Sequence, residues 1–360
     1  MNFKVECKNR NTHIYTTGMP IISPVLRNLM GGEVMFSRKT KEIDSQFESI
    51  TNLEEVMLGG LKQSILIRGE NINNPLMLFL HGGPGTAQIG FAPKFQRELE
   101  KHFTVVNWDQ RGAGLSYSKG LKKEDLTIEN MVNDTVELIQ HLLTRFKQPK
   151  LFLVGHSWGT VLGVKTSQKV PELIYGYIGI GQVVNMREGE KVSYDYTIRK
   201  AKDLNNKKAQ KELMSKEFNP TDMKFLKVQR KWLTKFGGSF IGVSMYNLVY
   251  STMLFRSEYT MKDWMRFLKA GKFSLDSLWE QIVDVNLLET APRLETPVYI
   301  FAGKHDYQTP FPLAEQYFHT LECPHKELIW FENSGHLLNY EEVEKFNEEC
   351  IKIKENTLVI

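Results

Sequence analysis

The sequence predicts an α/β fold in which helices cover both faces of a mostly parallel central sheet and an inserted helical segment forms a lid. Short apolar runs alternate with helical patterns from about residue 54 to residue 184, and such runs return after residue 290. A helical block rich in aromatic residues separates these two regions. Alternation of strands and helices favours a parallel sheet, and 360 residues are enough to bury its core.

The expected strands follow from short apolar segments, several of which end in Gly, His or Asp, as is typical of strands buried on both faces. The first two form a hairpin around Gly59-Gly60. A helix is expected over residues 127–146, where apolar residues recur at helical spacing and Thr127 is a suitable N-cap. The expected strands are residues 55–58, 63–67, 76–80, 104–108, 151–154, 175–180, 297–301 and 327–331.

These elements divide the chain into four regions. Residues 1–53 lack a clear periodicity and are expected to form an N-terminal extension that packs against, or is tethered to, the rest of the chain. Residues 54–184 and 291–360 are the two expected parts of the α/β core. Between them, residues 185–290 are the expected helical lid.

The charge and hydropathy of the chain exclude several classes of partner. Its 46 basic and 42 acidic residues give a net charge of +4, without a basic block interleaved with aromatics, so nucleic-acid binding is not expected. The apolar stretch of residues 19–26 contains two prolines and is too short to span a bilayer, which leaves only weak interfacial contact open. No signal peptide is visible, and we expect a cytoplasmic protein without stable membrane insertion.

The cysteines indicate a reducing environment. Cys7, Cys323 and Cys350 are too few and too scattered for a disulfide framework or a zinc site, so free thiols are expected. No metal or other cofactor is expected.

The segment Gly155-His156-Ser157-Trp158-Gly159 lies between an apolar strand and a helical pattern. A Gly-x-Ser-x-Gly turn at that point forces the serine into a sharp, strained elbow above the end of the sheet. Side chains at the two glycines would collide with the neighbouring strand and helix. Ser157 is therefore the candidate nucleophile.

A serine hydroxyl needs a base to remove its proton and an acid to orient that base. In the elbow architecture these partners follow the serine in the order acid, then histidine. Asp306 comes just after the strand of residues 297–301, and His336 comes just after the strand of residues 327–331. Ser157, Asp306 and His336 are thus the predicted catalytic triad.

The other histidines are given structural interpretations. His156 is expected to pack or hydrogen-bond locally, since adjacent residues at an elbow point in different directions. His81 and His102 are expected to be structural, and no role is assigned to His305.

The glycine-rich turn His81-Gly82-Gly83-Pro84-Gly85 follows the strand of residues 76–80. Acyl transfer builds negative charge on the substrate carbonyl oxygen, and fixed backbone N–H groups stabilise that charge. One donor is expected to be the N–H of Trp158 and the other an N–H of the Gly82-Gly83 turn. A phosphate-binding loop is disfavoured, because Pro84 lacks a donor and no Lys-Ser/Thr pair comes after it.

The loop of residues 108–116 follows the next strand and contains Asp109 and Arg111. Both residue types can act in catalysis. A rigid loop braced by a local ion pair, which buttresses the oxyanion turn, is the favoured interpretation.

Together, these three motifs resemble those of the proline iminopeptidase (prolyl aminopeptidase) branch of the α/β-hydrolases, in the same order along the chain. The resemblance covers roughly residues 54–350. It implies an α/β-hydrolase fold and a cofactor-free serine peptidase that removes an N-terminal residue, typically proline, from short peptides. It also implies that Gly83 and Trp158 supply the oxyanion hole. The chain departs from the family at the elbow, where His156 replaces the usual glycine before the serine.

Proline specificity in that family depends on lid carboxylates that hold the substrate's free amine. A cation in a partly dry pocket needs a paired carboxylate. The candidates here are Glu188, Glu190 and Glu258, although each is also compatible with an ordinary solvated glutamate.

The leading hypothesis is therefore a serine aminopeptidase acting on a small or short-peptide substrate with N-terminal proline or another small residue. A carboxylesterase or amidase for small acyl compounds is the alternative within the same chemistry. A non-catalytic binding relative is disfavoured by the intact triad, and epoxide or haloalkane hydrolysis by Ser157 at the elbow, where those reactions use a carboxylate. The oligomeric state is left open.

Overall fold

The structure is a computed structural model that describes residues 38–215, 217–243, 248 and 258–358. Residues 1–37 of the expected extension, including Cys7 and the apolar stretch 19–26, lie outside these described residues. The same holds for three aromatic residues of the expected lid, Tyr246, Tyr250 and Phe255.

The described chain forms one eight-stranded sheet in the order β1-β2-β4-β3-β5-β6-β7-β8. β2 runs antiparallel to both of its neighbours, and every pair from β4 to β8 is parallel, which confirms the predicted mostly parallel sheet. The strands are β1 (Ile50–Leu58), β2 (Leu61–Gly69), β3 (Leu76–Leu80), β4 (Thr104–Asp109), β5 (Leu151–His156), β6 (Ile174–Ile180), β7 (Val298–Gly303) and β8 (Lys326–Phe331).

The predicted strands are all present, and β1 differs most from its predicted bounds. It begins at Ile50, inside the range expected for the extension, and its residues 50–53 pair with residues 66–69 of β2. The start of this edge strand is only partly buried. It therefore lacks the apolar alternation from which a strand is recognised in a sequence.

Helices cover both faces of the sheet, as the sequence predicts. Thr127 caps α3 as expected, since its side chain accepts a hydrogen bond from the backbone N–H of Asn130 at 3.0 Å. The helices of the described residues are α2 (Leu99–His102), α3 (Ile128–Phe146), α4 (Trp158–Lys169), α5 (Met186–Asp203), α6 (Lys207–Met214), α7 (Met223–Lys235), α9 (Met261–Val283), α10 (Leu287–Thr290), α11 (Phe311–Thr320), α12 (Leu338–Glu341) and α13 (Val343–Leu358).

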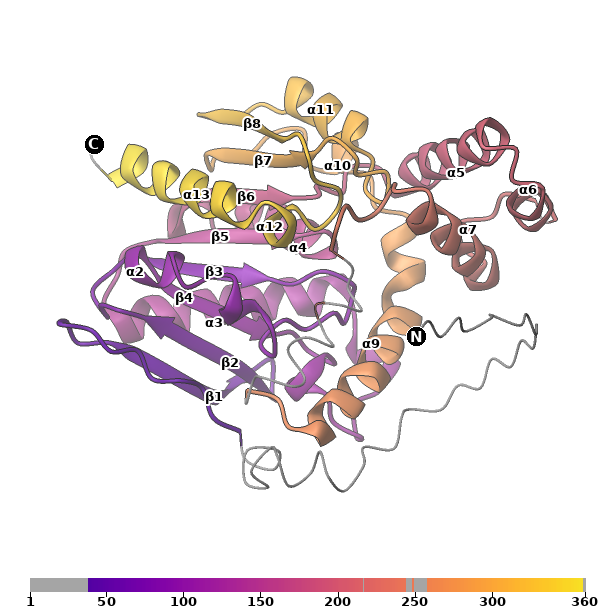
Figure 1. The fold of residues 1–360 in the computed structure, drawn as a ribbon. Coiled ribbons are helices and arrows are strands. Elements are labelled where there is room, and N and C mark those ends of the chain that lie inside the picture. Colours follow the sequence, from indigo (N-terminus) through magenta and orange to yellow (C-terminus); the bar gives the residue numbers. More distant parts are fainter. Residues whose placement is uncertain (1–37, 216, 244–247, 249–257, 359–360) are drawn as a thin grey trace, which may run out of the picture.

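Two apolar clusters fill the spaces between the sheet and its helices. In β3, Leu78 belongs to the cluster that contains residues of α3 and α4, and the adjacent Phe79 belongs to the cluster that contains residues of α13. This alternation is what a strand with two buried faces requires. In Figure 1, α13 crosses one face of the sheet while α3 lies behind the strands.

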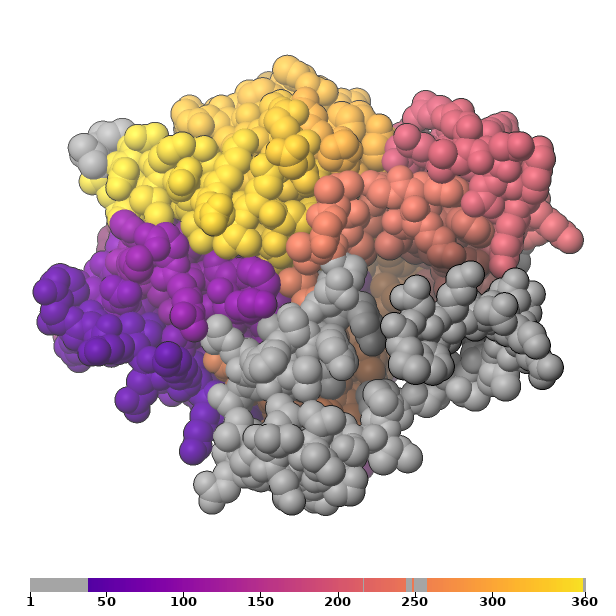
Figure 2. Space-filling model, in the orientation of Figure 1, coloured from indigo at the N-terminus to yellow at the C-terminus, as the bar shows by residue number. Residues whose placement is uncertain are grey.

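Residues 185–290 hold α5, α6, α7, α9 and α10, and their described part contains no strand. Figure 1 shows α5, α6 and α7 grouped at one end of the molecule, with the long α9 below them. In Figure 2 the same three helices form a lobe beside the core.

The described end of the N-terminal region contacts the start of α9. Arg38 donates two hydrogen bonds to the carboxylate of Asp263, at 2.9 and 2.8 Å. Thr40 donates to Glu258 at 3.3 Å and accepts from Arg68 of β2 at 2.5 Å. This segment therefore connects the sheet to the base of α9.

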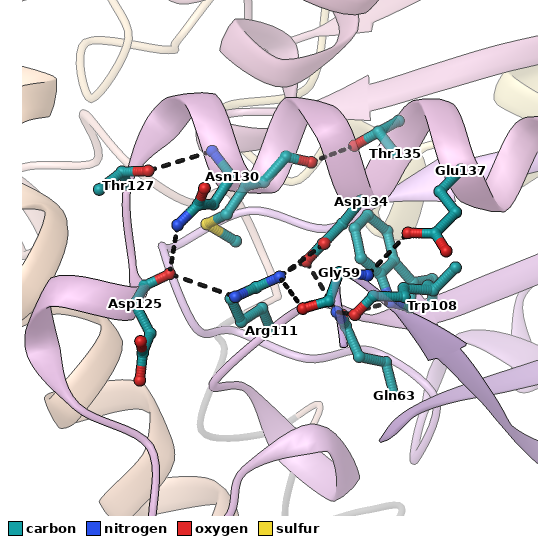
Figure 3. Close-up of polar contacts among 12 residues, drawn as sticks. Gly59, Gln63, Trp108, Arg111, Asp125, Thr127, Asn130, Asp134, Thr135 and Glu137 are labelled. Carbon is teal, nitrogen blue, oxygen red and sulfur yellow. Dashed lines mark hydrogen bonds and ion pairs between the residues drawn. The ribbon is translucent and has the colours of Figure 1, made fainter. Parts of the chain in front are cut away.

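The loop after β4 is fixed by a buried ion pair between Arg111 and Asp134 of α3, shown in Figure 3. Both hydrogen bonds of the pair measure 2.7 Å. Gln63 of β2 donates to the same carboxylate at 2.7 Å, and Trp108 donates to Gln63 at 3.1 Å. The expected bracing of the loop by an ion pair is present. The partner of Arg111 is Asp134 of α3 and not Asp109 of the same loop, whose side chain accepts from Leu115 and Tyr259.

We expect Asp134→Ala to destabilise the protein by about 3–5 kcal/mol, because it leaves the buried guanidinium of Arg111 without its counter-charge. Denaturant unfolding measures this loss. The exposed pair of Lys62 and Glu55 supplies a control, and Glu55→Ala is expected to cost at most about 1 kcal/mol. Equal losses in the two variants would contradict this account of the loop.

Candidate active site

Ser157 lies between β5 and α4 in the strained conformation expected of an elbow. Its φ of 53° and ψ of −118° fall in a region that non-glycine residues rarely adopt. Close packing enforces the turn. A Cβ on Gly159 would lie 2.1 Å from the carbonyl oxygen of Leu80 in β3, and a Cβ on Gly155 would lie 2.6 Å from the carbonyl oxygen of Gly159. Both glycines are therefore required on steric grounds, as predicted.

Asp306 and His336 are in direct contact and almost completely buried. Nδ1 of His336 lies 2.8 Å from Oδ2 of Asp306. The carboxylate is held by the backbone N–H groups of Gln308 and Thr309, at 2.8 and 2.9 Å. The hydroxyl of Thr309 also donates to Oδ2 at 2.8 Å and lies 3.1 Å from Nδ1 of His336. These contacts fix the imidazole ring and leave its Nε2 for other chemistry.

His156, the neighbour of Ser157, bonds locally, as expected. Its Nε2 lies 2.9 Å from the carbonyl oxygen of His336, so this nitrogen carries the proton and donates. Burial, and then the neighbouring His336, lower the pKa of His156 to about 3. The ring is neutral at ordinary pH and supports the loop that carries His336.

His81 is a structural residue, as expected, and it joins two loops. Its Nε2 accepts a hydrogen bond from the backbone N–H of Gln110 at 3.1 Å, and its Nδ1 lies 2.9 Å from the carbonyl oxygen of Gly82. Burial lowers the pKa of His81 to about 4, which keeps the ring neutral with Nε2 as an acceptor.

The glycine turn lies against the elbow. A Cβ on Gly82 would lie 3.2 Å from Cβ of Ser157. Trp158 is the first residue of α4, where a backbone N–H has no acceptor within its own helix. Gly83 has a φ of 118°, a backbone conformation that favours glycine. The turn and the helix start are thus adjacent to the candidate nucleophile.

Gln110 connects these two segments, although no sequence motif assigns it a role. Its side chain is completely buried, donates to the carbonyl of His81 at 3.0 Å and accepts from the indole of Trp158 at 3.0 Å. In the sequence, only its position between Asp109 and Arg111 pointed to Gln110, and a glutamine in a loop has no distinctive pattern. Thr309 is a second residue of the site that sequence patterns do not single out.

A cavity of about 480 Å³ lies over these residues. Gly83, Ser157 and Trp158 all line it, so the structure brings the candidate nucleophile and both candidate oxyanion residues to one space. The wall is otherwise mainly apolar, with charged residues from α5, α7 and α9. The other lining residues are Val183, Met186, Glu190, Met223, Leu226, Lys227, Arg230, Lys272, Leu275, Asp276, Trp279, Ile282, Gln308 and Thr309.

The three candidate carboxylates lie in different surroundings. Glu190 lines the cavity, is only 2% exposed and pairs with Arg230 through Oε1, while its buried Oε2 has no hydrogen-bond partner in the described chain. Glu188 is exposed and faces a different hollow. Glu258 is buried beside Thr40 and is not part of the lining. Of the three, Glu190 alone lines the cavity that contains Ser157.

Asp109, the last residue of β4, has a completely buried carboxyl group. It accepts hydrogen bonds from the backbone N–H of Leu115, at 2.9 Å, and from the hydroxyl of Tyr259. Burial raises the pKa of Asp109 to about 7, although these two hydrogen bonds oppose the shift. It anchors Tyr259, close to the start of α9, to the loop after β4.

The described residues contain no cluster of three or more His, Cys, Asp or Glu side chains suited to hold a metal ion. Within the same part of the chain, no helix has the length and apolar character needed to cross a membrane.

Comparison with known proteins agrees with the fold and with the motifs. A sequence profile described as alpha/beta hydrolase fold matches residues 75–343. The chain is 38% identical over 305 residues to the "Probable aminopeptidase YbaC" of Bacillus subtilis (strain 168), covering 83% of this chain and 95% of that protein. A proline iminopeptidase of Arabidopsis thaliana is 38% identical over 103 residues, which are 28% of this chain and 25% of that protein.

A solved structure has the same architecture. The crystal structure of a proline iminopeptidase from Mycobacterium smegmatis superimposes with a TM-score of 0.62 at 16% identity, over 86% of this chain and 99% of that one. The predicted fold and the resemblance to the proline iminopeptidases are both confirmed.

The raised pKa of Asp109 predicts a pH-dependent stability difference between the protein and Asp109→Asn. Folded Asp109 keeps its proton up to about pH 7, whereas the unfolded carboxyl loses it near its ordinary pKa of 3.8. The contribution of this group to stability therefore falls as the pH rises between these values. Asparagine does not titrate, so the stability of the unchanged protein relative to Asp109→Asn is expected to fall over this window.

Urea unfolding at intervals from pH 4 to pH 8 measures this difference. The other titrating groups are common to both proteins and cancel. A difference that stays constant with pH would show that Asp109 is ionised throughout.

Proposed function

Because the chain belongs to the α/β-hydrolase fold family, we propose that it is a serine hydrolase in which Ser157 is the nucleophile, His336 the general base and Asp306 the orienting carboxylate. The contact between His336 and Asp306 carries this proposal, since it fixes the ring through Nδ1 and leaves Nε2 to take the serine proton. The three residues follow β5, β8 and β7, strands whose parallel pairing brings their carboxyl ends to one edge of the sheet.

The reaction then follows the order of acyl transfer. Ser157 attacks the scissile carbonyl while Nε2 of His336 accepts its proton, and the resulting imidazolium is stabilised by Asp306. The oxyanion receives hydrogen bonds from the backbone N–H groups of Trp158 and Gly83. His336 then returns the proton to the leaving amine, and water repeats the sequence to release the acyl group.

The substrate we favour is a short peptide with proline or another small residue at its N-terminus. The apolar wall of the cavity suits a small apolar side chain. The carboxylate of Glu190, which lines the cavity, suits the substrate's ammonium group, because a cation removed from water needs an opposite charge. Relatives named as an aminopeptidase and a proline iminopeptidase support the same activity.

One observation favours the alternative, a carboxylesterase or amidase for small acyl compounds. Glu190 already pairs with Arg230, and this pairing weakens its attraction for a second cation. If the ion pair between Glu190 and Arg230 persists when substrate binds, the apolar wall contacts an acyl group and no free amine is required.

Three substrates separate these activities. They are the proline amide of a chromogenic amine, the same amide with its proline nitrogen blocked, and a short-chain nitrophenyl ester. We expect turnover of the free amide and a loss of at least about tenfold in kcat/KM on blocking, since the blocked nitrogen carries no charge for Glu190. Equal turnover of the blocked amide would exclude the aminopeptidase and favour the alternative.

Ser157→Ala tests the hydrolase chemistry itself. It removes the nucleophile and is expected to abolish turnover of all three substrates, by a factor of about 10⁴ or more in kcat. Circular dichroism checks that the variant is folded. Undiminished turnover in the folded variant would mean that another residue carries the reaction.

We expect Gln110→Ala to lower kcat by about tenfold or more with little change in KM, because Gln110 links the two segments that form the oxyanion hole. The affinity for a prolyl aldehyde, whose adduct with Ser157 presents an oxyanion, is expected to fall in parallel. A purely structural role would lower the amount of folded protein while leaving kcat per folded molecule and aldehyde affinity unchanged.

A further inference from the structure

The wall of the cavity holds more positive than negative groups. Its charged lining residues are Glu190, Lys227, Arg230, Lys272 and Asp276. Glu190 pairs with Arg230, and Asp276 pairs with Lys272. Lys227 has no ion pair within the described residues, so one positive charge is left uncompensated in a mainly apolar wall.

Hydrogen bonds to two neighbouring side chains orient Arg230 without using all of its N–H donors. One terminal nitrogen donates to Glu190, and the other donates to the side chain of Gln229, which is completely buried. A guanidinium carries five N–H groups, so these two contacts leave three without an acceptor in the part of the chain that the structure describes. Glu190 and Gln229 thus orient a planar group whose remaining donors suit a carboxylate.

Lys227 and Arg230 are three residues apart on α7, so their side chains emerge on the same side of the helix. Both line the cavity that contains Ser157. An anion between them therefore meets two cations at the wall of the proposed active site.

We propose that Lys227 and Arg230 form a carboxylate subsite that binds the free C-terminus of a dipeptide substrate. The inference rests on the proposed function and narrows its substrate class. Arg230 contacts Glu190 directly, so the amine and carboxylate subsites are neighbours. The two residues of a dipeptide span at most about 7 Å, so one short substrate can present both of its charged ends to neighbouring subsites. In longer peptides the C-terminal carboxylate lies beyond the reach of Lys227 and Arg230.

The test compares prolyl-alanine with prolyl-alaninamide, which have the same scissile bond and the same free amine. They differ at the C-terminus, where one has a carboxylate and the other a neutral amide. We expect kcat/KM to be about tenfold higher for the free acid, chiefly through KM. Raising the salt concentration is expected to reduce this preference, since the subsite is partly exposed.

Lys227→Gln is expected to lower the ratio of the two kcat/KM values about fivefold, because it removes one of the two cations. Lys224→Gln is the matched control. Lys224 is an exposed lysine on the same helix that does not line the cavity, and its substitution is expected to leave the ratio unchanged.

Two failures are distinguishable. Equal kcat/KM for the two peptides, or equal ratios in Lys227→Gln and Lys224→Gln, overturns the carboxylate subsite while prolyl hydrolysis stands. Absence of turnover with both peptides and with the chromogenic prolyl amide overturns the aminopeptidase, and the subsite with it.

Discussion

The close approach of α4 to β3 is the contact on which the candidate site depends. Because Gly159 has no side chain, the start of α4 lies against the carbonyl of Leu80. This close packing holds the backbone of Ser157 in its strained conformation. The same contact puts the first N–H of α4 beside the glycine turn that comes after β3. One packing constraint thus positions the candidate nucleophile and both candidate oxyanion donors together.

Buried polar contacts then make this arrangement rigid. Gln110 bonds to the turn through His81 and to α4 through Trp158, while the adjacent Arg111 ties the same loop to α3 through Asp134. Such bonds are strong where water is excluded, and each unmade one is costly. The loop after β4 therefore supports the site through two neighbouring residues that bond in different directions.

The sequence predicts those parts of the structure that are determined by short local patterns. The strands, the capped start of α3 at Thr127 and the elbow at Ser157 each follow from a few consecutive residues. The link from Arg111 to Asp134 joins residues that no motif relates, so it cannot be read from spacing. The roles of Glu188 and Glu190 depend on which side of α5 faces the cavity, and that of Glu258 on where its loop packs. Both are matters of tertiary packing.

The proposed specificity depends on how the charged groups of the cavity wall pair with one another. Oε1 of Glu190 is neutralised by Arg230 and its Oε2 is buried without a partner in the described chain, so the pair is incompletely satisfied without substrate. A neutral acyl group entering the cavity leaves that oxygen unpaired, and the penalty for a buried unsatisfied acceptor remains. In the proposed substrate complex a zwitterion relieves it, because the ammonium group pairs with the carboxylate of Glu190 while the substrate carboxylate accepts from the remaining donors of Arg230. On this proposal the wall discriminates between substrates by the cost of leaving its own charges unpaired.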